Sequence, residues 1–198
     1  MQAKVLLPGL FLLVCQFSLA LPDFTGFRED DSPVFDGYLS EAHAKNLNVG
    51  VADIQEMEPG PDEMLIRIYA GFGIQPTRIG GHPLDLKEIR VKDEVVTMLW
   101  YPACPGRPET TRTTPDNAWR ILQEQNFFTI RDSRTFPDYP GMLDGITYLI
   151  QIKTVDTYRE FTVSNPQDYE SEDNERLLTT LRIIEDEFDT PGCYAIGP

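Results

Sequence analysis

The chain has 198 residues, of which 32 are acidic and 17 basic, and its formal net charge is −15. An acidic surface of this kind repels polyanions, so we expect no binding of nucleic acid or of anionic lipid. The acidic residues occur in short groups without the alternating oxygen ligands and central glycine of a calcium loop, and we predict neither a metal site nor a cofactor.

Residues 1–20 have the parts of a secretory signal: the basic residue Lys4, an apolar run over residues 5–17, and small residues ending at Ala20. We therefore expect cleavage after Ala20 and export to the periplasm or the extracellular medium. The apolar run is shorter than the roughly 20 residues that span a bilayer, so we expect no transmembrane span in the mature chain. A lipid-modified Cys15, which would tether the protein to a membrane, is an alternative.

The mature chain divides into two parts. Residues 21–62 are rich in proline, glycine and polar residues, and we expect an irregular lead-in with a short helix near residues 38–46. Regular patterns begin at Met64, and residues 63–198 have the length of a single domain.

Alternation of apolar and polar residues predicts strands over residues 64–70, 86–91 and 95–101. The second and third strands are separated by a short polar turn, which predicts an antiparallel hairpin. A second hairpin is predicted from residues 145–153 and 158–163.

Thr114 and Pro115 are typical of a helix start, because the threonine oxygen can cap the helix and proline has no amide hydrogen to lose. We expect this helix to end near Gln125. Asn165 and Pro166 repeat the pattern before a second helix. The apolar stripe of that helix consists of Leu177, Leu181, Ile184 and Phe188.

Together these elements predict an α+β domain with an antiparallel sheet of about five to six strands, built from two hairpins. We expect the two main helices to pack on one face of the sheet. Residues 127–130 are a candidate for a further short strand.

Three local patterns accompany this order of elements. They are the aromatic pair Phe127 and Phe128, the step from Asp144 to Gly145 that opens a strand, and the aromatic and basic pair Tyr158 and Arg159. With them, the region from Leu65 to Phe188 resembles a set of uncharacterised bacterial secreted proteins and lipoproteins. The resemblance implies this fold and an envelope location. It implies no activity, because none is assigned to the set.

Two cysteines, Cys104 and Cys193, would stay in the exported chain after the signal is removed. An oxidising compartment favours a disulfide between them, which would tie the tail to the domain and stabilise it by roughly 4 to 5 kcal/mol in the chain-entropy model. Reactive free thiols are the alternative.

The chain has two histidines, His43 and His82, and no glycine-flanked serine nucleophile accompanies either of them. We interpret His43 as a surface position on a helix and His82 as a residue of a solvent-facing turn. No catalytic residue is predicted.

The long loop over residues 131–144 is the candidate for a binding site. It combines Arg131 and Arg134 with Phe136 and Tyr139, a mixture suited to contact with a partner. Alternatively, the aromatic residues pack as a lid on the sheet edge while the arginines pair locally.

These features favour an exported soluble protein that acts as a non-enzymatic binding or accessory protein of the cell envelope, with another envelope protein as its possible partner. A hydrolase that uses aspartate or glutamate carboxylates is an alternative, as is a purely structural envelope protein.

Overall fold

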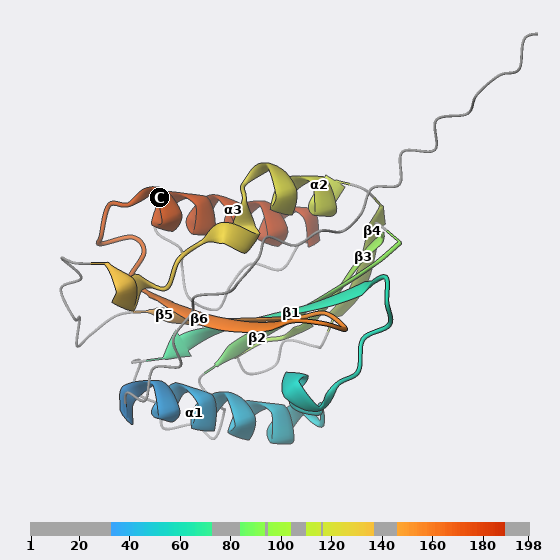
Figure 1. Cartoon of the computed structure of the whole chain (residues 1–198), viewed down its shortest axis with the longest axis horizontal. Coiled ribbons are helices and arrows are strands. Elements are labelled where there is room, and N and C mark those ends of the chain that lie inside the picture. The colour runs from blue at the N-terminus through green and yellow to red at the C-terminus, as the bar shows by residue number, and fades with distance from the viewer. Residues whose placement is uncertain are drawn as a thin grey trace, which may run out of the picture.

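The computed structural model describes residues 33–72, 84–93, 95–103, 110–115, 117–136 and 146–188. These residues form a six-stranded antiparallel sheet with the strand order β4-β3-β2-β1-β5-β6 (Figure 1). The strands are β1 (Glu63–Phe72), β2 (Asp85–Lys92), β3 (Val95–Tyr101), β4 (Thr110–Pro115), β5 (Thr147–Lys153) and β6 (Tyr158–Ser164). The predicted α+β fold with its two hairpins is confirmed.

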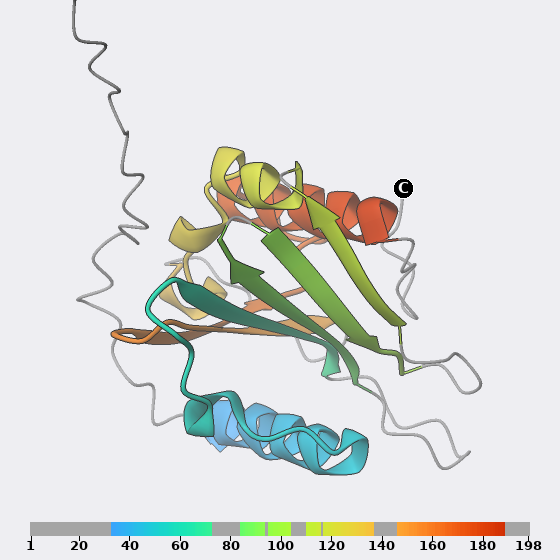
Figure 2. The ribbon, with the colours of Figure 1, turned by 90° about the vertical axis from the view of Figure 1, so that its right-hand side faces the viewer.

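Helices cover both faces of this sheet. Helices α2 (Asn117–Glu124) and α3 (Glu172–Phe188) lie on one face, as predicted, and α1 (Pro33–Val49) lies on the other (Figure 2). Three short 3-10 helices, η1 (Ile54–Glu56), η2 (Phe127–Thr129) and η3 (Ser133–Thr135), occur in the connections.

Strand β1 lies in the middle of the sheet and joins the two hairpins. It pairs with β2 on one side and β5 on the other, so that Ile66 lies between Ile89 and Ile152. Because successive side chains of a strand point to opposite faces, alternate residues of β1 supply two different layers.

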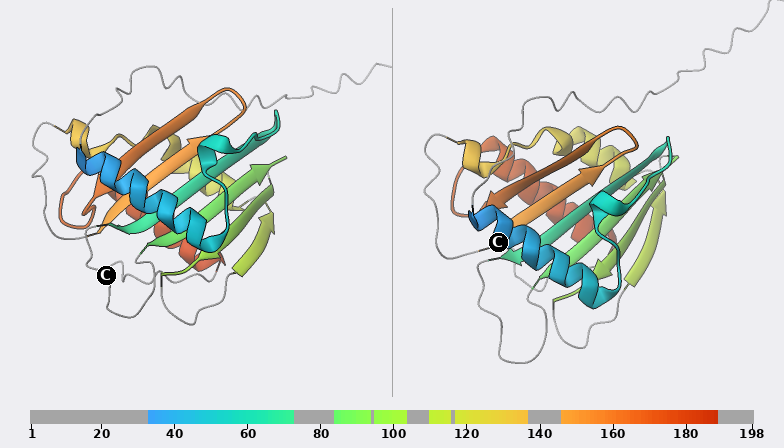
Figure 3. Two further views of the ribbon diagram at one scale, coloured as in Figure 1. Left: turned by 90° about the horizontal axis from the view of Figure 1, so that it is seen from below. Right: turned by 60° about the horizontal axis from the view of Figure 1, so that its bottom comes forward.

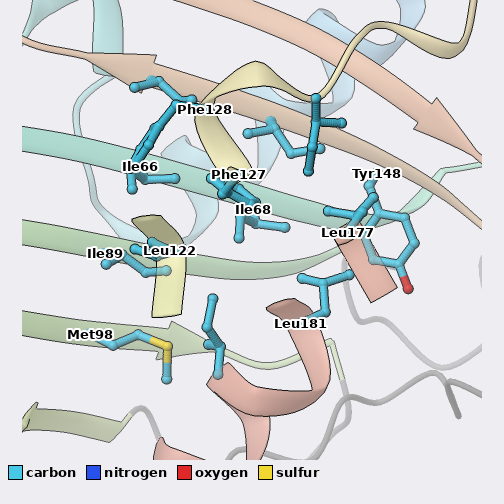
Figure 4. Close-up of a cluster of buried hydrophobic side chains, with 14 of the residues drawn as sticks. Ile66, Ile68, Ile89, Met98, Leu122, Phe127, Phe128, Tyr148, Leu177 and Leu181 are labelled. Carbon is cyan, nitrogen blue, oxygen red and sulfur yellow. The ribbon is translucent and has the colours of Figure 1, made fainter. Parts of the chain in front are cut away.

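The larger core lies between the sheet and helices α2 and α3. Figure 4 shows Leu122 of α2, Phe127 of η2, and Leu177 and Leu181 of α3 close to sheet residues such as Ile68. Each of these side chains is at most 2% exposed. Burial of this apolar surface is the main source of the stability of the domain.

The layer under α1 is smaller and contains more polar groups. Its buried apolar residues are Ala42, Tyr69, Leu84, Leu86, Tyr101 and Leu149. Helix α1 is longer than the short helix expected near residues 38–46. Its apolar stripe is weak, because the buried positions include Lys45 and Asn46 while Leu47 is exposed.

The predicted strand over residues 127–130 is wrong. Asn126 has a left-handed backbone with a φ of 49°, and the Thr129 amide donates to the Asn126 carbonyl, which forms the 3-10 helix η2. The carbonyls of Phe128 and Ile130 accept hydrogen bonds from the buried Arg159 side chain. The Arg159 side chain therefore supplies the hydrogen bonds that a neighbouring strand would otherwise donate to these carbonyls.

The predicted start of α2 at Pro115 is also wrong. Pro115 is the last residue of β4 and lies opposite Val95, and α2 begins at Asn117. Continued pairing with β3 thus extends the strand through the residues that were expected to cap the helix.

Helix α3 begins later than Asn165 and Pro166 suggest. The Asp168 amide donates to the Asn165 carbonyl, which closes a turn. The helix starts at Glu172, where the Ser171 hydroxyl accepts the Asn174 amide at 3.1 Å. Ser171 therefore has the capping role that was assigned to Asn165.

Several sequence predictions fall on residues that the structure does not describe. These are the signal with Cys15, the disulfide of Cys104 and Cys193, and the positions of His82 and Tyr139. They stay predictions.

The core can be tested with a matched pair of leucine substitutions. Leu177→Ala is expected to lower the free energy of unfolding by about 2 to 5 kcal/mol, because it leaves a cavity at a side chain that is 0% exposed. Leu47→Ala, at a side chain that is 68% exposed, is expected to change it by less than about 0.5 kcal/mol. Urea unfolding measures both, and equal effects would contradict this account of the core.

Candidate functional site

A pocket of about 230 Å³ lies between α1 and the sheet. Figure 3 shows α1 and the segment that carries η1 lying over this face of the sheet. The residues that line the pocket come from α1, the η1 segment and β5. They are Leu39, Ala42, His43, Asn46, Asp53, Ile54, Gln55 and Gln151. Pockets for drug-sized ligands have volumes from about 300 Å³ upward, so this one suits a smaller molecule or a single chemical group.

His43 and Asp53 form the most prominent pair in the pocket. The His43 Nδ1 atom lies 2.5 Å from Asp53 Oδ2. The other oxygen, Asp53 Oδ1, accepts a hydrogen bond of 2.7 Å from Asn46. The Tyr69 hydroxyl then donates to Asn46 Oδ1 at 2.9 Å, so a chain of hydrogen bonds runs from the buried sheet to the exposed imidazole.

The carboxyl group of Asp53 is held in its charged form. Burial by itself would raise the pKa of Asp53, but the hydrogen bonds from Asn46 and His43 lower it below its usual value. The nearby guanidinium of Arg67 adds to this effect. Asp53 is therefore a carboxylate at neutral pH, and it fixes the orientation of the His43 ring.

A second group of polar side chains connects the lining residues Gln55 and Gln151 to β6. The Nε2 atoms of Gln55 and Gln151 donate to the Tyr158 hydroxyl at 3.2 and 3.0 Å. Tyr158 in turn donates to Glu160. Burial and the charge of Glu160 raise the pKa of Tyr158, so its hydroxyl keeps its proton.

Arg67 connects the η1 segment to the sheet behind the pocket. Its side chain is fully buried and donates to Glu88 Oε2 through Nε at 2.9 Å and Nη2 at 2.7 Å. Its Nη1 atom also donates to the Ala52 carbonyl at 2.7 Å. Since Ala52 directly precedes Asp53, the buried guanidinium sets the position of one wall of the pocket.

The predicted binding loop is described as far as Phe136, and these residues pack on the domain. Phe136 is 8% exposed and its ring stacks on Tyr169 with centroids 6.0 Å apart. The Arg131 guanidinium lies 4.7 Å above the Phe136 ring and pairs with Asp173 at 2.8 Å. Arg131 keeps 61% of its side chain exposed.

Arg134 pairs within the same segment, and its neighbours cover the edge of the sheet. It lies 2.5 Å from Asp132, whose Oδ2 atom accepts the backbone amide of Thr162 in β6 at 3.0 Å. Ser133 donates to the Thr162 carbonyl at 3.2 Å and accepts from the Ser164 amide at 3.3 Å. These hydrogen bonds satisfy backbone groups of the edge strand β6, which could otherwise pair with a strand of another chain.

A buried charged cluster lies on the opposite face of the sheet. Lys87 pairs with Asp85 at 2.9 Å and with Glu185 of α3 at 3.2 Å, and the Trp100 indole donates to Asp85 at 2.7 Å. The Lys87 ammonium contacts both carboxylates, and the cluster joins α3 to β2. We interpret it as a structural cluster.

Sequence reasoning identified no residue of the pocket as functional. It placed His43 on a helix surface and gave no role to Asp53. The spacing of His43 and Asn46 did carry one signal, because residues three apart share a helix face. Nothing in the sequence pattern indicated that the segment after α1 folds back to bring Asp53 beside them.

The buried ion pair can be tested with a double-mutant cycle. Arg67→Met is expected to destabilise the protein by about 3 to 5 kcal/mol, because it leaves the buried Glu88 with only the half-exposed Arg90 at 3.6 Å as its ion-pair partner. Adding Glu88→Leu is expected to recover most of this loss. Urea unfolding of the two single variants and the double variant measures the coupling, and additive effects would contradict the role of the pair.

The lowered pKa of Asp53 predicts the direction of a pH effect. Its stabilising contribution is fully present above the unfolded pKa of aspartate, about 3.9, and is lost as pH falls through the lower folded pKa. The difference in unfolding free energy between wild type and Asp53→Asn is therefore expected to shrink below about pH 4. Urea unfolding at pH 7, 5 and 3 checks this, and a constant difference would refute it.

Within the part of the chain that the structure describes, no helix is long and apolar enough to cross a membrane, and no group of three or more histidine, cysteine, aspartate or glutamate side chains could hold a metal ion. No protein-family model matches the chain, and no curated protein is significantly similar to it.

Proposed function

We propose that the protein is an exported, non-enzymatic binding protein of the cell envelope, and that the pocket between α1 and β5 holds its ligand. The observation that carries this proposal is the oriented His43 imidazole at the pocket. Its ring is more than half exposed, yet the chain through Asp53, Asn46 and Tyr69 fixes it.

This chain of hydrogen bonds is better explained by binding than by stability. An exposed contact between a histidine and a carboxylate contributes little to stability, because water competes for the hydrogen bond and screens the carboxylate. Holding a polar side chain in one orientation beside an apolar hollow, in contrast, lowers the entropy lost when a ligand binds. Leu39, Ala42 and Ile54 supply the apolar part of this hollow.

The size of the pocket limits what can enter it. A volume of about 230 Å³ admits a small molecule or one group of a larger envelope component. Export and the envelope location rest on the signal in residues 1–20 and on the resemblance described above.

A carboxylate-based hydrolase is less well supported. Two carboxylates have to face the reacting bond in such an enzyme. Asp53 is the one carboxylate among the described residues that line the pocket, while Glu88 and Glu160 are held by Arg67 and Tyr158. These described lining residues also include no serine, threonine or cysteine that could act as a nucleophile.

The imidazole signals of the chain's two histidines give a direct test. We expect members of a library of small polar compounds to shift the signal of His43, assigned with His43→Gln, in protein labelled with ¹³C-histidine. Ala42→Met, which fills the pocket, should abolish these shifts, whereas Val155→Met in the exposed turn between β5 and β6 should retain them. Shifts that persist in folded Ala42→Met, or a library without a single binder, would overturn the proposal.

A further inference from the structure

The polar atoms that the pocket offers to a ligand are mainly hydrogen-bond acceptors. A carboxylate at neutral pH can only accept, so the 2.5 Å contact with Asp53 places a hydrogen on His43 Nδ1. In this tautomer the Nε2 atom carries the lone pair, and it has no protein partner among the described residues. His43 therefore offers a ligand an acceptor.

The two glutamines offer acceptors for a similar reason. Their Nε2 atoms are directed to Tyr158, and that of Gln151 also lies 3.4 Å from Glu160. No described residue donates to the oxygen of either amide. Both glutamines line the pocket, so these oxygens are accessible acceptors for a ligand that donates.

The charges around the pocket favour a cation. Asp53 is the only aspartate or glutamate among the described lining residues. The nearby cations are engaged elsewhere: Arg67 donates to Glu88 and the Ala52 carbonyl, and Lys153 donates to the Gln55 carbonyl. In the part of the chain that the structure describes, neither lysine nor arginine lines the pocket.

We infer that the ligand presents a primary ammonium group on a short alkyl chain, a conclusion that rests on the proposed function. An ammonium group has three donors and no acceptor, which suits His43 Nε2 and the oxygens of Gln55 and Gln151. The carboxylate of Asp53 balances its charge. The alkyl chain lies against Leu39, Ala42 and Ile54. Free alkylamines and the side chain of lysine share this chemistry.

The test compares three probes of similar size and different charge. n-Butylammonium, 1-butanol and butyrate are titrated into the full mature chain at pH 7.5, and the side-chain amide signals of Gln55 and Gln151 report binding by ¹⁵N NMR. Because a charged hydrogen bond is stronger than a neutral one, we expect butylammonium to bind at least about tenfold more tightly than butanol. Butyrate is expected to bind most weakly.

A fourth probe, Nα-acetyl-lysine N-methylamide, separates the two sources of the ammonium group. Tighter binding than that of butylammonium would assign the site to a lysine side chain, and weaker binding would assign it to a free amine. Either result supports an ammonium ligand.

A substitution at the exposed His43 tests the role of charge with little risk to folding. His43→Lys places a fixed cation in the pocket and is expected to weaken butylammonium binding at least about tenfold, and to weaken it more than butanol binding. The matched control Val155→Lys places the same cation in the exposed turn between β5 and β6, outside the pocket, and is expected to retain butylammonium binding within about threefold. Asp53→Asn removes the negative charge and should weaken butylammonium binding as His43→Lys does.

The outcomes separate the two proposals. If none of the probes binds to wild type, the pocket is no ligand site, and both the proposed function and this inference fail. If butanol or butyrate binds as tightly as butylammonium, or if His43→Lys keeps the wild-type affinity for butylammonium, the inference is overturned while the proposed function stands.

Discussion

Arg67 carries a full charge in the central strand of the sheet, where no part of its side chain reaches solvent. Desolvation of a guanidinium is tolerable only when its donors are satisfied, and here Glu88 and the Ala52 carbonyl accept them. The hydrogen bond to the Ala52 carbonyl lies outside the sheet, and it fixes the segment that leads into η1. The position of Asp53, and with it the orientation of His43, therefore depends on an ion pair whose residues are not among the described lining of the pocket.

The two faces of the sheet have different physical roles. The face under α2 and α3 is apolar and supplies most of the burial that stabilises the fold. The face under α1 has few buried apolar residues and many hydrogen bonds, among them those of Tyr69 and Tyr158. Binding sites commonly occupy the less apolar and less stable part of a domain, because polar groups there can still exchange protein partners for ligand atoms.

The strongly acidic composition is only partly a matter of solubility. Asp85, Asp132 and Asp173 are each at most 3% exposed and are held by hydrogen bonds or ion pairs. Asp132 caps an edge strand, and Asp85 organises a charged cluster under α3. Buried carboxylates thus take part in the architecture, whereas the partly exposed Asp53 lines the pocket.

Local periodicity is enough to predict the elements that have one apolar face. The alternation of Ile66 and Ile68 with Arg67 predicts a strand, and Leu177, Leu181 and Ile184 predict the apolar face of α3. Other features follow from contacts between segments distant in the chain. Pairing with β3 placed Pro115 in a strand, Arg159 satisfied the carbonyls of η2, and the fold-back after α1 brought Asp53 to His43. Such contacts join polar groups that are distant in the sequence, and the local pattern of apolar and polar residues does not indicate which of them come together.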